Sequence, residues 1–160
     1  MNNPFIYFGT PYVARDTLAL LKAHDIVPTL VVTAPDSPRG RGLSLTPTET
    51  KEWAQLHHIP VFTPLTIDTD AIQKIASYGC DYAIVVAYGK ILPQALIDIF
   101  PKGILNIHYS LLPKYRGASP VESAIRNGDT TTGVSIQRMV YALDAGDIVA
   151  QTETAIGPSE

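Results

Sequence analysis

The sequence has little cysteine, few charges and no long apolar run. Its single cysteine, Cys80, cannot form an internal disulfide, which fits a reducing cytoplasm. No stretch approaches the roughly 18 consecutive apolar residues that a membrane-spanning helix needs. Residues 1–4 also lack the basic start of a secretory signal. We therefore expect a cytoplasmic protein that has no membrane partner.

A basic excess and the common nucleotide and metal motifs are also missing. The formal net charge is −3, which argues against a long basic face for nucleic acid, although a local basic loop stays open. Neither G-x-G-x-x-G nor a Walker A lysine follows Gly9-Thr10-Pro11. The pair His57-His58 has no neighbouring ligands, so we expect no metal.

Apolar segments and turn residues alternate along the chain. With 160 residues, 46% of them hydrophobic, the chain is long enough for one domain with a real core. Strands are expected at 5–8, 26–33, 61–62, 82–86, 104–108, 133–139 and 148–154, and helices at about 10–21, 48–57, 71–78, 93–99 and from 119. This alternation predicts an α/β fold with an open, mostly parallel, doubly wound (Rossmann-like) sheet, whose last two strands pair near an edge.

Local signals refine three of these segments. Thr10 is expected to cap the first helix, whose buried face would include Leu20. Ser119 and Glu122 have the spacing of a capping box, with proline at the first helical position. The Pro/Gly-rich stretch 34–47 is expected to be a loop, too rich in breakers to be a helix.

Asn106 and His108 alternate at the end of a predicted strand, so both side chains should leave on the same face. A carboxamide beside an imidazole suits acyl transfer, because the pair can stabilise an oxyanion and His can move a proton. The alternative is that both residues only satisfy backbone groups at the strand end. A carboxylate is needed to orient such a histidine, and Asp144, in the turn 143–147, offers one unless that turn is an ordinary Asp/Gly turn.

The run NIHYSLLPKYRGASP at 106–120, followed by LDAGDI at 143–148, resembles the formyltetrahydrofolate-dependent formyltransferase family. The resemblance implies 10-formyltetrahydrofolate as co-substrate, no metal, and a catalytic trio of Asn106, His108 and Asp144. It gives Asp147 a structural role in the turn. It also implies folate contacts from the SLLP segment and from VVAYGKIL at 85–92, namely Ser110, Leu111, Leu112, Pro113, Tyr88, Ile91 and Leu92.

Two further segments, FGTP at 8–11 and APDSPRGRG at 34–42, resemble the branch of this family whose acceptor is initiator methionyl-tRNA. Arg41 matches the arginine that approaches the tRNA in that branch. The chain departs from the pattern at 43–45, where lysines are usual, and at Tyr109, where a small residue is common. An amino-sugar nucleotide or glycinamide ribonucleotide as acceptor, or a fragment that binds folate without turnover, are the alternatives.

The resemblance extends over residues 1–160, and it implies the N-terminal catalytic part of such an enzyme. Residues 156–160 read as the turn and cap of a helix that does not follow. We therefore expect a truncated catalytic domain that lacks the C-terminal RNA-binding barrel of the family.

Overall fold

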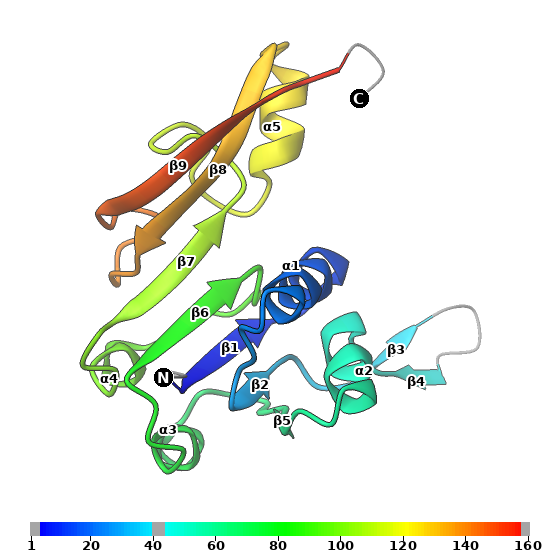
Figure 1. The fold of residues 1–160 in the computed structure, drawn as a ribbon, viewed down its shortest axis with the longest axis vertical. Helices are drawn as coiled ribbons and strands as arrows, with labels where there is room; N and C mark the ends of the chain where they lie inside the picture. The colour runs from blue at the N-terminus through cyan, green and yellow to red at the C-terminus, as the bar shows by residue number, and fades with distance from the viewer. Residues whose placement is uncertain (1–3, 40–43, 158–160) are drawn as a thin grey trace.

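Seven strands form one sheet in the computed structural model, which describes residues 4–39 and 44–157. The strands are β1 (Phe5–Gly9), β2 (Leu30–Val32), β5 (Val61–Phe62), β6 (Tyr82–Val86), β7 (Ile104–His108), β8 (Thr131–Arg138) and β9 (Ile148–Ala155). The helices are α1 (Tyr12–Ala23), α2 (Glu49–Leu56), α3 (Thr69–Ala76), α4 (Gln94–Ile97) and α5 (Pro120–Arg126). The order across the sheet is β5-β2-β1-β6-β7-β8-β9 (Figure 1).

The sheet is parallel from β5 to β7, whereas β8 and β9 are antiparallel. The predicted α/β class and the pairing of the last two strands at one edge are therefore confirmed. The strand order reverses beside β1, because the chain first builds β2 and β5 on one side and then β6 and β7 on the other. In such a sheet the loops beyond the carboxyl ends of the strands hold ligands.

Alternating residues of β1 supply the two halves of the core. Ile6 and Phe8 pack on the face that carries α3 and α4, in one cluster with Ile75 and Leu96. Phe5 and Tyr7 pack on the opposite face, which α1 and α2 cover. Strands covered on both faces are apolar throughout, as Tyr82–Val86 is. Cys80 is buried in the first of these clusters, where it serves as a small apolar side chain.

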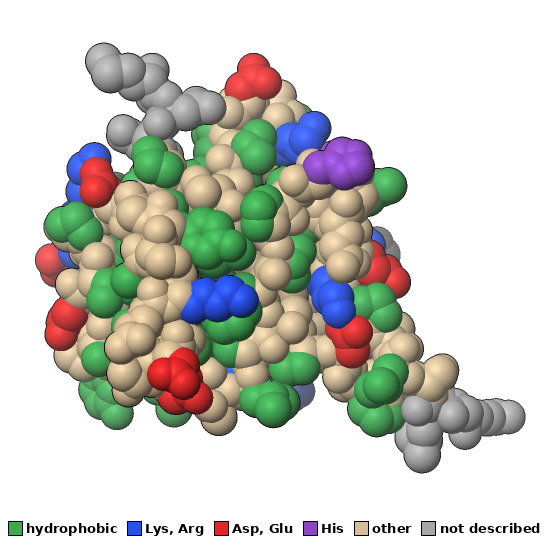
Figure 2. Space-filling view, turned by 90° about the horizontal axis from the view of Figure 1, so that it is seen from below, with side chains coloured by type: hydrophobic (Ala, Val, Ile, Leu, Met, Phe, Trp, Pro, Cys, Tyr) green, Lys and Arg blue, Asp and Glu red, His purple; other side chains and the backbone are tan. Residues whose placement is uncertain are grey.

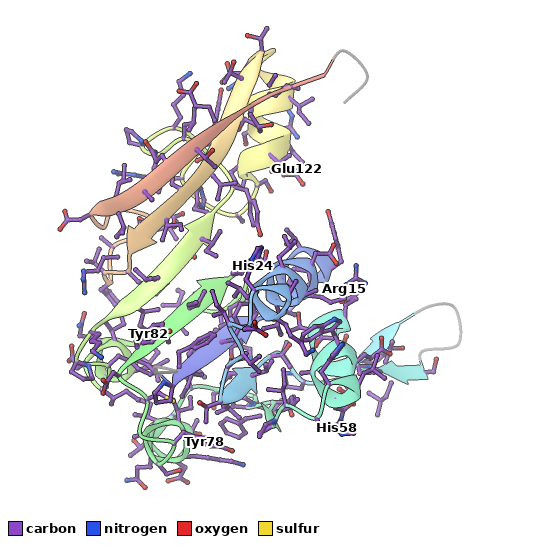
Figure 3. The ribbon with its side chains drawn as sticks, viewed as in Figure 1. Arg15, His24, His58, Tyr78, Tyr82 and Glu122 are labelled. Carbon is purple, nitrogen blue, oxygen red and sulfur yellow. The ribbon has the colours of Figure 1, made fainter. Side chains whose placement is uncertain are left out.

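Some local predictions were wrong in detail. Thr10 does not cap α1: Pro11 is the N-cap residue, and the Thr10 hydroxyl donates to the Tyr88 carbonyl instead. The strand expected over 26–33 is restricted to Leu30–Val32, since residues 26 and 27 are exposed. Helix α5 begins at Pro120 as expected, with Glu122 in its first turn (Figure 3), but Ser119 makes no side-chain capping bond.

The stretch predicted as an irregular loop contains a short hairpin. Within the described residues, strands β3 (Ser37–Arg39) and β4 (Ser44–Thr46) pair only with each other, and they project from the body (Figure 1). At the base of the hairpin, Lys51 of α2 donates to both carboxylate oxygens of Asp36, at 2.6 and 2.8 Å. The hydroxyls of Thr33 and Thr48 lie 2.8 Å apart and are buried. These contacts fix the hairpin to the sheet through α2.

The surface carries charges of both signs. Among the coloured side chains of Figure 2, acidic, basic and hydrophobic groups are interspersed, without one continuous basic field. No helix in the described ranges has the length and apolar composition that crossing a bilayer requires.

The buried face of α1 passes through Leu18, which is fully buried, and not through Leu20, which is 65% exposed. Leu18→Ala should lower the free energy of unfolding by about 2–5 kcal/mol, because it leaves a cavity in the core. Leu20→Ala on the same helix should change it by less than about 0.5 kcal/mol. Urea unfolding of the two variants measures the difference. Equal losses would contradict this orientation of α1.

Candidate active site

Polar side chains gather where β7 and β8 lie side by side. Asn106 and His108 leave β7 on one face, and both are buried. Their Cα partners on β8 are Gln137 and Ser135, which are buried as well. A buried face made of four polar residues is unusual in a core, because each polar group needs a partner there. The partners come from the turns that follow the two strands.

The Asp144 carboxylate is the common partner of this group. Its Oδ1 accepts from Asn106 Nδ2 at 3.1 Å and from Gln137 Nε2 at 2.8 Å. Its Oδ2 accepts from the Gly117 backbone N–H at 2.8 Å. Only 8% of the Asp144 side chain is exposed. Three elements, β7, β8 and the turn at 117, therefore fix the orientation of one carboxylate.

The His108 ring lies between two hydrogen-bond acceptors. Its Nε2 is 2.8 Å from the Tyr115 carbonyl oxygen, and its Nδ1 is 3.7 Å from Asp144 Oδ2. Because a carbonyl oxygen can only accept, Nε2 carries a proton in this arrangement. The Nδ1 distance is longer than a direct hydrogen bond but leaves Nδ1 facing the carboxylate. The imidazole thus connects the turn at 115–117 with the turn at 143–147.

The two turns have backbone conformations that few residues adopt. Tyr115, Gly117 and Asp144 have φ values of 56°, 103° and 45°. A Cβ on Gly146 would lie 1.7 Å from the Arg138 carbonyl oxygen, so the turn requires glycine at this position. The Asp147 carbonyl accepts from the Arg138 N–H at 2.8 Å and closes the turn. The glycine at position 146 of the motif therefore has a steric cause.

The SLLP segment divides into residues that hold the loop and residues that line a hollow. Ser110 is fully buried, and its hydroxyl donates to the Lys114 carbonyl at 2.6 Å. Ser135 Oγ donates to the Ser110 carbonyl and accepts from the Leu112 N–H. Leu111 and Pro113 instead line a hollow of about 270 Å³. The rest of its lining is Lys114, Tyr115, Asp129, Thr131 and Thr132.

The second predicted folate segment follows β6. Ile91 is 82% exposed and is available to a ligand, whereas Leu92 is buried in the core. Tyr88 is 3% exposed and packs edge-on against Phe8, and its hydroxyl has no hydrogen-bond partner within the described residues. The backbone of Tyr88 accepts from Thr10, which ties this loop to the loop after β1.

Sequence reasoning missed the residues that hold Asp144 and His108, chiefly Gln137, Gly117 and Tyr115. One signal could have indicated Gln137. Gln137 and Ser135 occupy alternate positions of a strand whose other face reads Val134 and Ile136, so the buried face of β8 is polar. The backbone groups of Gly117 and Tyr115 have no signal in residue type.

Other predicted residues lie away from this group. Arg41 is outside the described residues. His57 ends α2, where its Nδ1 is 2.8 Å from the Trp53 carbonyl oxygen and its ring stacks on Trp53. His58 follows directly after the C-cap residue of α2 (Figure 3). The His57–His58 pair is thus used in closing a helix.

Solved structures share the whole architecture. A phosphoribosylglycinamide formyltransferase from Bacillus halodurans superposes with a TM-score of 0.78 at 22% identity, covering 98% of this chain and 82% of that one. A formyltetrahydrofolate deformylase from Pseudomonas syringae superposes with a TM-score of 0.76 at 19% identity, covering 100% of this chain and 53% of that one. The chain therefore has the same α/β fold as these two enzymes.

Sequence similarity identifies the family of the chain more specifically than the fold does. The family described as formyl transferase matches residues 1–160. Methionyl-tRNA formyltransferases are 48% identical in Elusimicrobium minutum, over 97% of this chain and 46% of that protein, and 47% identical in Chromohalobacter salexigens, over 94% and 47%. The chain belongs to the formyl transferase family. It spans about half the length of these curated relatives.

The burial of Tyr88 in the segment after β6 can be tested through the dependence of stability on pH. Burial raises the pKa of Tyr88 to about 12. An unfolded tyrosine titrates near pH 10, so the wild type should lose stability as the pH rises from about 10 to about 12. Tyr88→Phe removes the contribution of Tyr88 to this loss, along with a hydroxyl that lacks a partner in the described residues.

We expect Tyr88→Phe to be at least as stable as the wild type at pH 7, with an advantage that grows from pH 10 to 12. Urea unfolding across this range measures the effect, and Tyr12→Phe, at a 64% exposed position, is the control. A loss above about 1 kcal/mol at pH 7 would mean that the hydroxyl is hydrogen-bonded after all.

Proposed function

We propose that the chain is the formyl-transferring part of a methionyl-tRNA formyltransferase that works in the cytoplasm. It would move the formyl group of 10-formyltetrahydrofolate to the α-amino group of initiator methionyl-tRNA. The observation that carries the proposal is the buried Asn106–His108–Asp144 set in a chain of this family. The relatives named for this activity, 47% and 48% identical, support the choice of acceptor.

The reaction is an acyl transfer to an amine. The neutral amine attacks the formyl carbon, a new C–N bond forms, and the carbonyl oxygen becomes an oxyanion. A free α-amino group has a pKa of about 8, so a useful fraction of it is neutral near pH 7. Collapse of the intermediate breaks the bond between the formyl carbon and N10 of the folate. The amine loses one proton, and N10 gains one.

The chain offers a residue for each of these needs. The Asn106 amide donates to Asp144 in this structure, and it can donate to the oxyanion once it turns toward the reacting carbonyl. The Nε2–H of His108 donates to the Tyr115 carbonyl in this structure, and it can become a second donor when the oxyanion replaces that carbonyl as its acceptor. Asp144, which faces Nδ1, keeps the ring oriented and helps to accept the proton of the amine through water. A donor of this kind stabilises a transition state by about 3 kcal/mol.

The folate contacts proposed for the two predicted segments differ in kind. Leu111 and Pro113 line the hollow beside Tyr115, and Ile91 is exposed, so these side chains can contact a ligand directly. Ser110 and Leu112 act through the shape of the loop, because they are bonded to Lys114 and Ser135. Tyr88 and Leu92 form the buried base of the other segment.

A glycinamide ribonucleotide acceptor is the second candidate, and the fold alone favours it. The solved structures that match include several enzymes named for that substrate, with identities of 17–23%. Identities this low carry the fold and not the acceptor. Formylation assays that offer charged initiator tRNA, glycinamide ribonucleotide and an amino-sugar nucleotide in parallel decide among the acceptors. Turnover of a small acceptor alone would contradict the tRNA proposal.

His108→Ala and Asn106→Ala in the protein at its full natural length should each lower kcat by roughly 10²–10³-fold. The affinity for folate should stay nearly unchanged, because both side chains act on the reacting formyl group. Steady-state formylation kinetics and a folate-binding titration measure the two quantities. His24→Ala, at the exposed end of α1, is the matched control. Near-normal turnover in either active-site variant would make that residue structural.

Arg41 tests the tRNA acceptor. An arginine between Gly40 and Gly42 can pair with phosphates or reach base edges at an RNA end. Arg41→Ala should raise KM for initiator tRNA at least tenfold, about 1.4 kcal/mol, and leave folate affinity unchanged. The measurement compares charged tRNA with an aminoacyl mimic that lacks the acceptor stem. Equal losses with both acceptors would remove the tRNA role of this residue.

A further inference from the structure

We propose that Gln137 is a positioning residue that holds Asp144 in place while Asn106 turns its amide toward the reacting carbonyl. The inference rests on the proposed function, because it assigns Gln137 a part in the same acyl transfer. It starts from a competition that the structure displays. Two amides, one from β7 and one from β8, donate to the same carboxylate oxygen, Asp144 Oδ1.

The Gln137 bond is the shorter of the two, at 2.8 Å against 3.1 Å for Asn106. Gln137 is 2% exposed and lies opposite Asn106 in the antiparallel pair of β7 and β8. The orientation of its amide follows from chemistry, since an ionised carboxylate only accepts and the group that faces it must be the NH₂. Two strands thus present amide donors side by side to one oxygen.

Geometry makes the two donors unequal in what they can do. When Asn106 turns toward an oxyanion, Oδ1 still accepts from Gln137, and Oδ2 still accepts from the Gly117 N–H. Asp144 therefore keeps its orientation toward His108 Nδ1 without help from Asn106. When Asn106 moves away from Asp144, the bond from Gln137 therefore keeps the Asp144 carboxylate in place.

The rest of the Gln137 side chain argues against a role in stability alone. Its Oε1 is buried and has no hydrogen-bond partner within the described residues. A buried acceptor without a donor lowers stability, and an apolar side chain of the same size would avoid that cost. The pairing of β8 with β9 also shifts register between Ile136 and Gln137. Such irregularities re-aim side chains and are frequent beside active sites.

The first test needs no catalysis and uses the 160-residue chain. Asn106→Ala mimics the state in which Asn106 has left Asp144. Gly117 amide hydrogen exchange, followed by NMR, then reports whether the carboxylate stays in place. We expect the exchange rate of the Gly117 amide in Asn106→Ala to stay within threefold of the wild-type rate. In Asn106→Ala/Gln137→Met the same rate should be at least tenfold higher than in the wild type. Methionine keeps the length of glutamine but has no N–H donor.

The matched control is Asn106→Ala/Gln94→Met, because Gln94 donates to the Asp98 carboxylate on the exposed side of α4 at 2.7 Å. It should exchange at Gly117 like Asn106→Ala alone. A tenfold increase in Asn106→Ala itself, or none in the double variant, overturns the proposal. If the double variant does not fold, the single variant Gln137→Met and the kinetic test decide.

The kinetic test uses the protein at its full natural length, 10-formyltetrahydrofolate and charged initiator tRNA. Gln137→Met should lower kcat at least tenfold while KM for both substrates stays within twofold, and Gln94→Met should behave as wild type. Gln137→Glu should move the acidic limb of the pH profile of kcat/KM upward, since it sets a second carboxylate beside Asp144. His108, whose Nδ1 lies 3.7 Å from Asp144 Oδ2, is a second titratable side chain that faces Asp144.

The two kinds of failure are distinguishable. A wild type that formylates no acceptor contradicts the proposed function, and the exchange test still decides whether Gln137 holds Asp144. An active wild type whose kcat and pH profile are unaffected by both Gln137 substitutions overturns the positioning role. If the Gln137 substitutions lower stability but leave kcat and the pH profile unchanged, the positioning role is also overturned, because that result indicates a purely structural residue.

Discussion

The buried Asp144 carboxylate determines how β7, β8 and the turn at Gly117 are arranged around the site. A buried Asp144 requires donors on both oxygens, since an ionised group without partners is very costly in a low-dielectric interior. Those donors come from β7, from β8 and from the turn at Gly117, all of which must meet at one point. The antiparallel pairing of β8 with β7 provides that meeting point, because it sets Gln137 opposite Asn106. The edge of the sheet is thereby part of the site.

The sequence was informative where chemistry is encoded in residue type. The fold class followed from alternating apolar segments, and Tyr82–Val86 and Ile104–His108 have the bounds that the pattern predicts. Asn106, His108 and Asp144 were found as candidates, and the structure brings them into contact. The roles of the three residues in catalysis stay a prediction, since contact alone does not demonstrate turnover.

The rest could not be predicted, for identifiable physical reasons. Backbone groups such as the Gly117 N–H and the Tyr115 carbonyl hold the site, yet almost every residue type has these groups, so residue type does not reveal which of them bind Asp144 and His108. Thr10 was expected to cap a helix, but a long-range bond to Tyr88 competes for its hydroxyl, and sequence separation hides such a contact. The hairpin β3–β4 was missed because Pro38 and the glycines mask a short strand in any local pattern.

That hairpin also bears on how such a protein can diversify. Its two strands pair with each other and not with the seven-stranded sheet, and the Asp36–Lys51 ion pair and the Thr33–Thr48 contact attach its base to α2. Residues beyond the attachment can change in length, charge and sequence without altering the register of any strand that carries Asn106 or His108. Under the proposed function, Arg41 belongs to the stretch between β3 and β4 and the catalytic trio does not, so the acceptor contact and the chemical step would depend on separate segments of the chain.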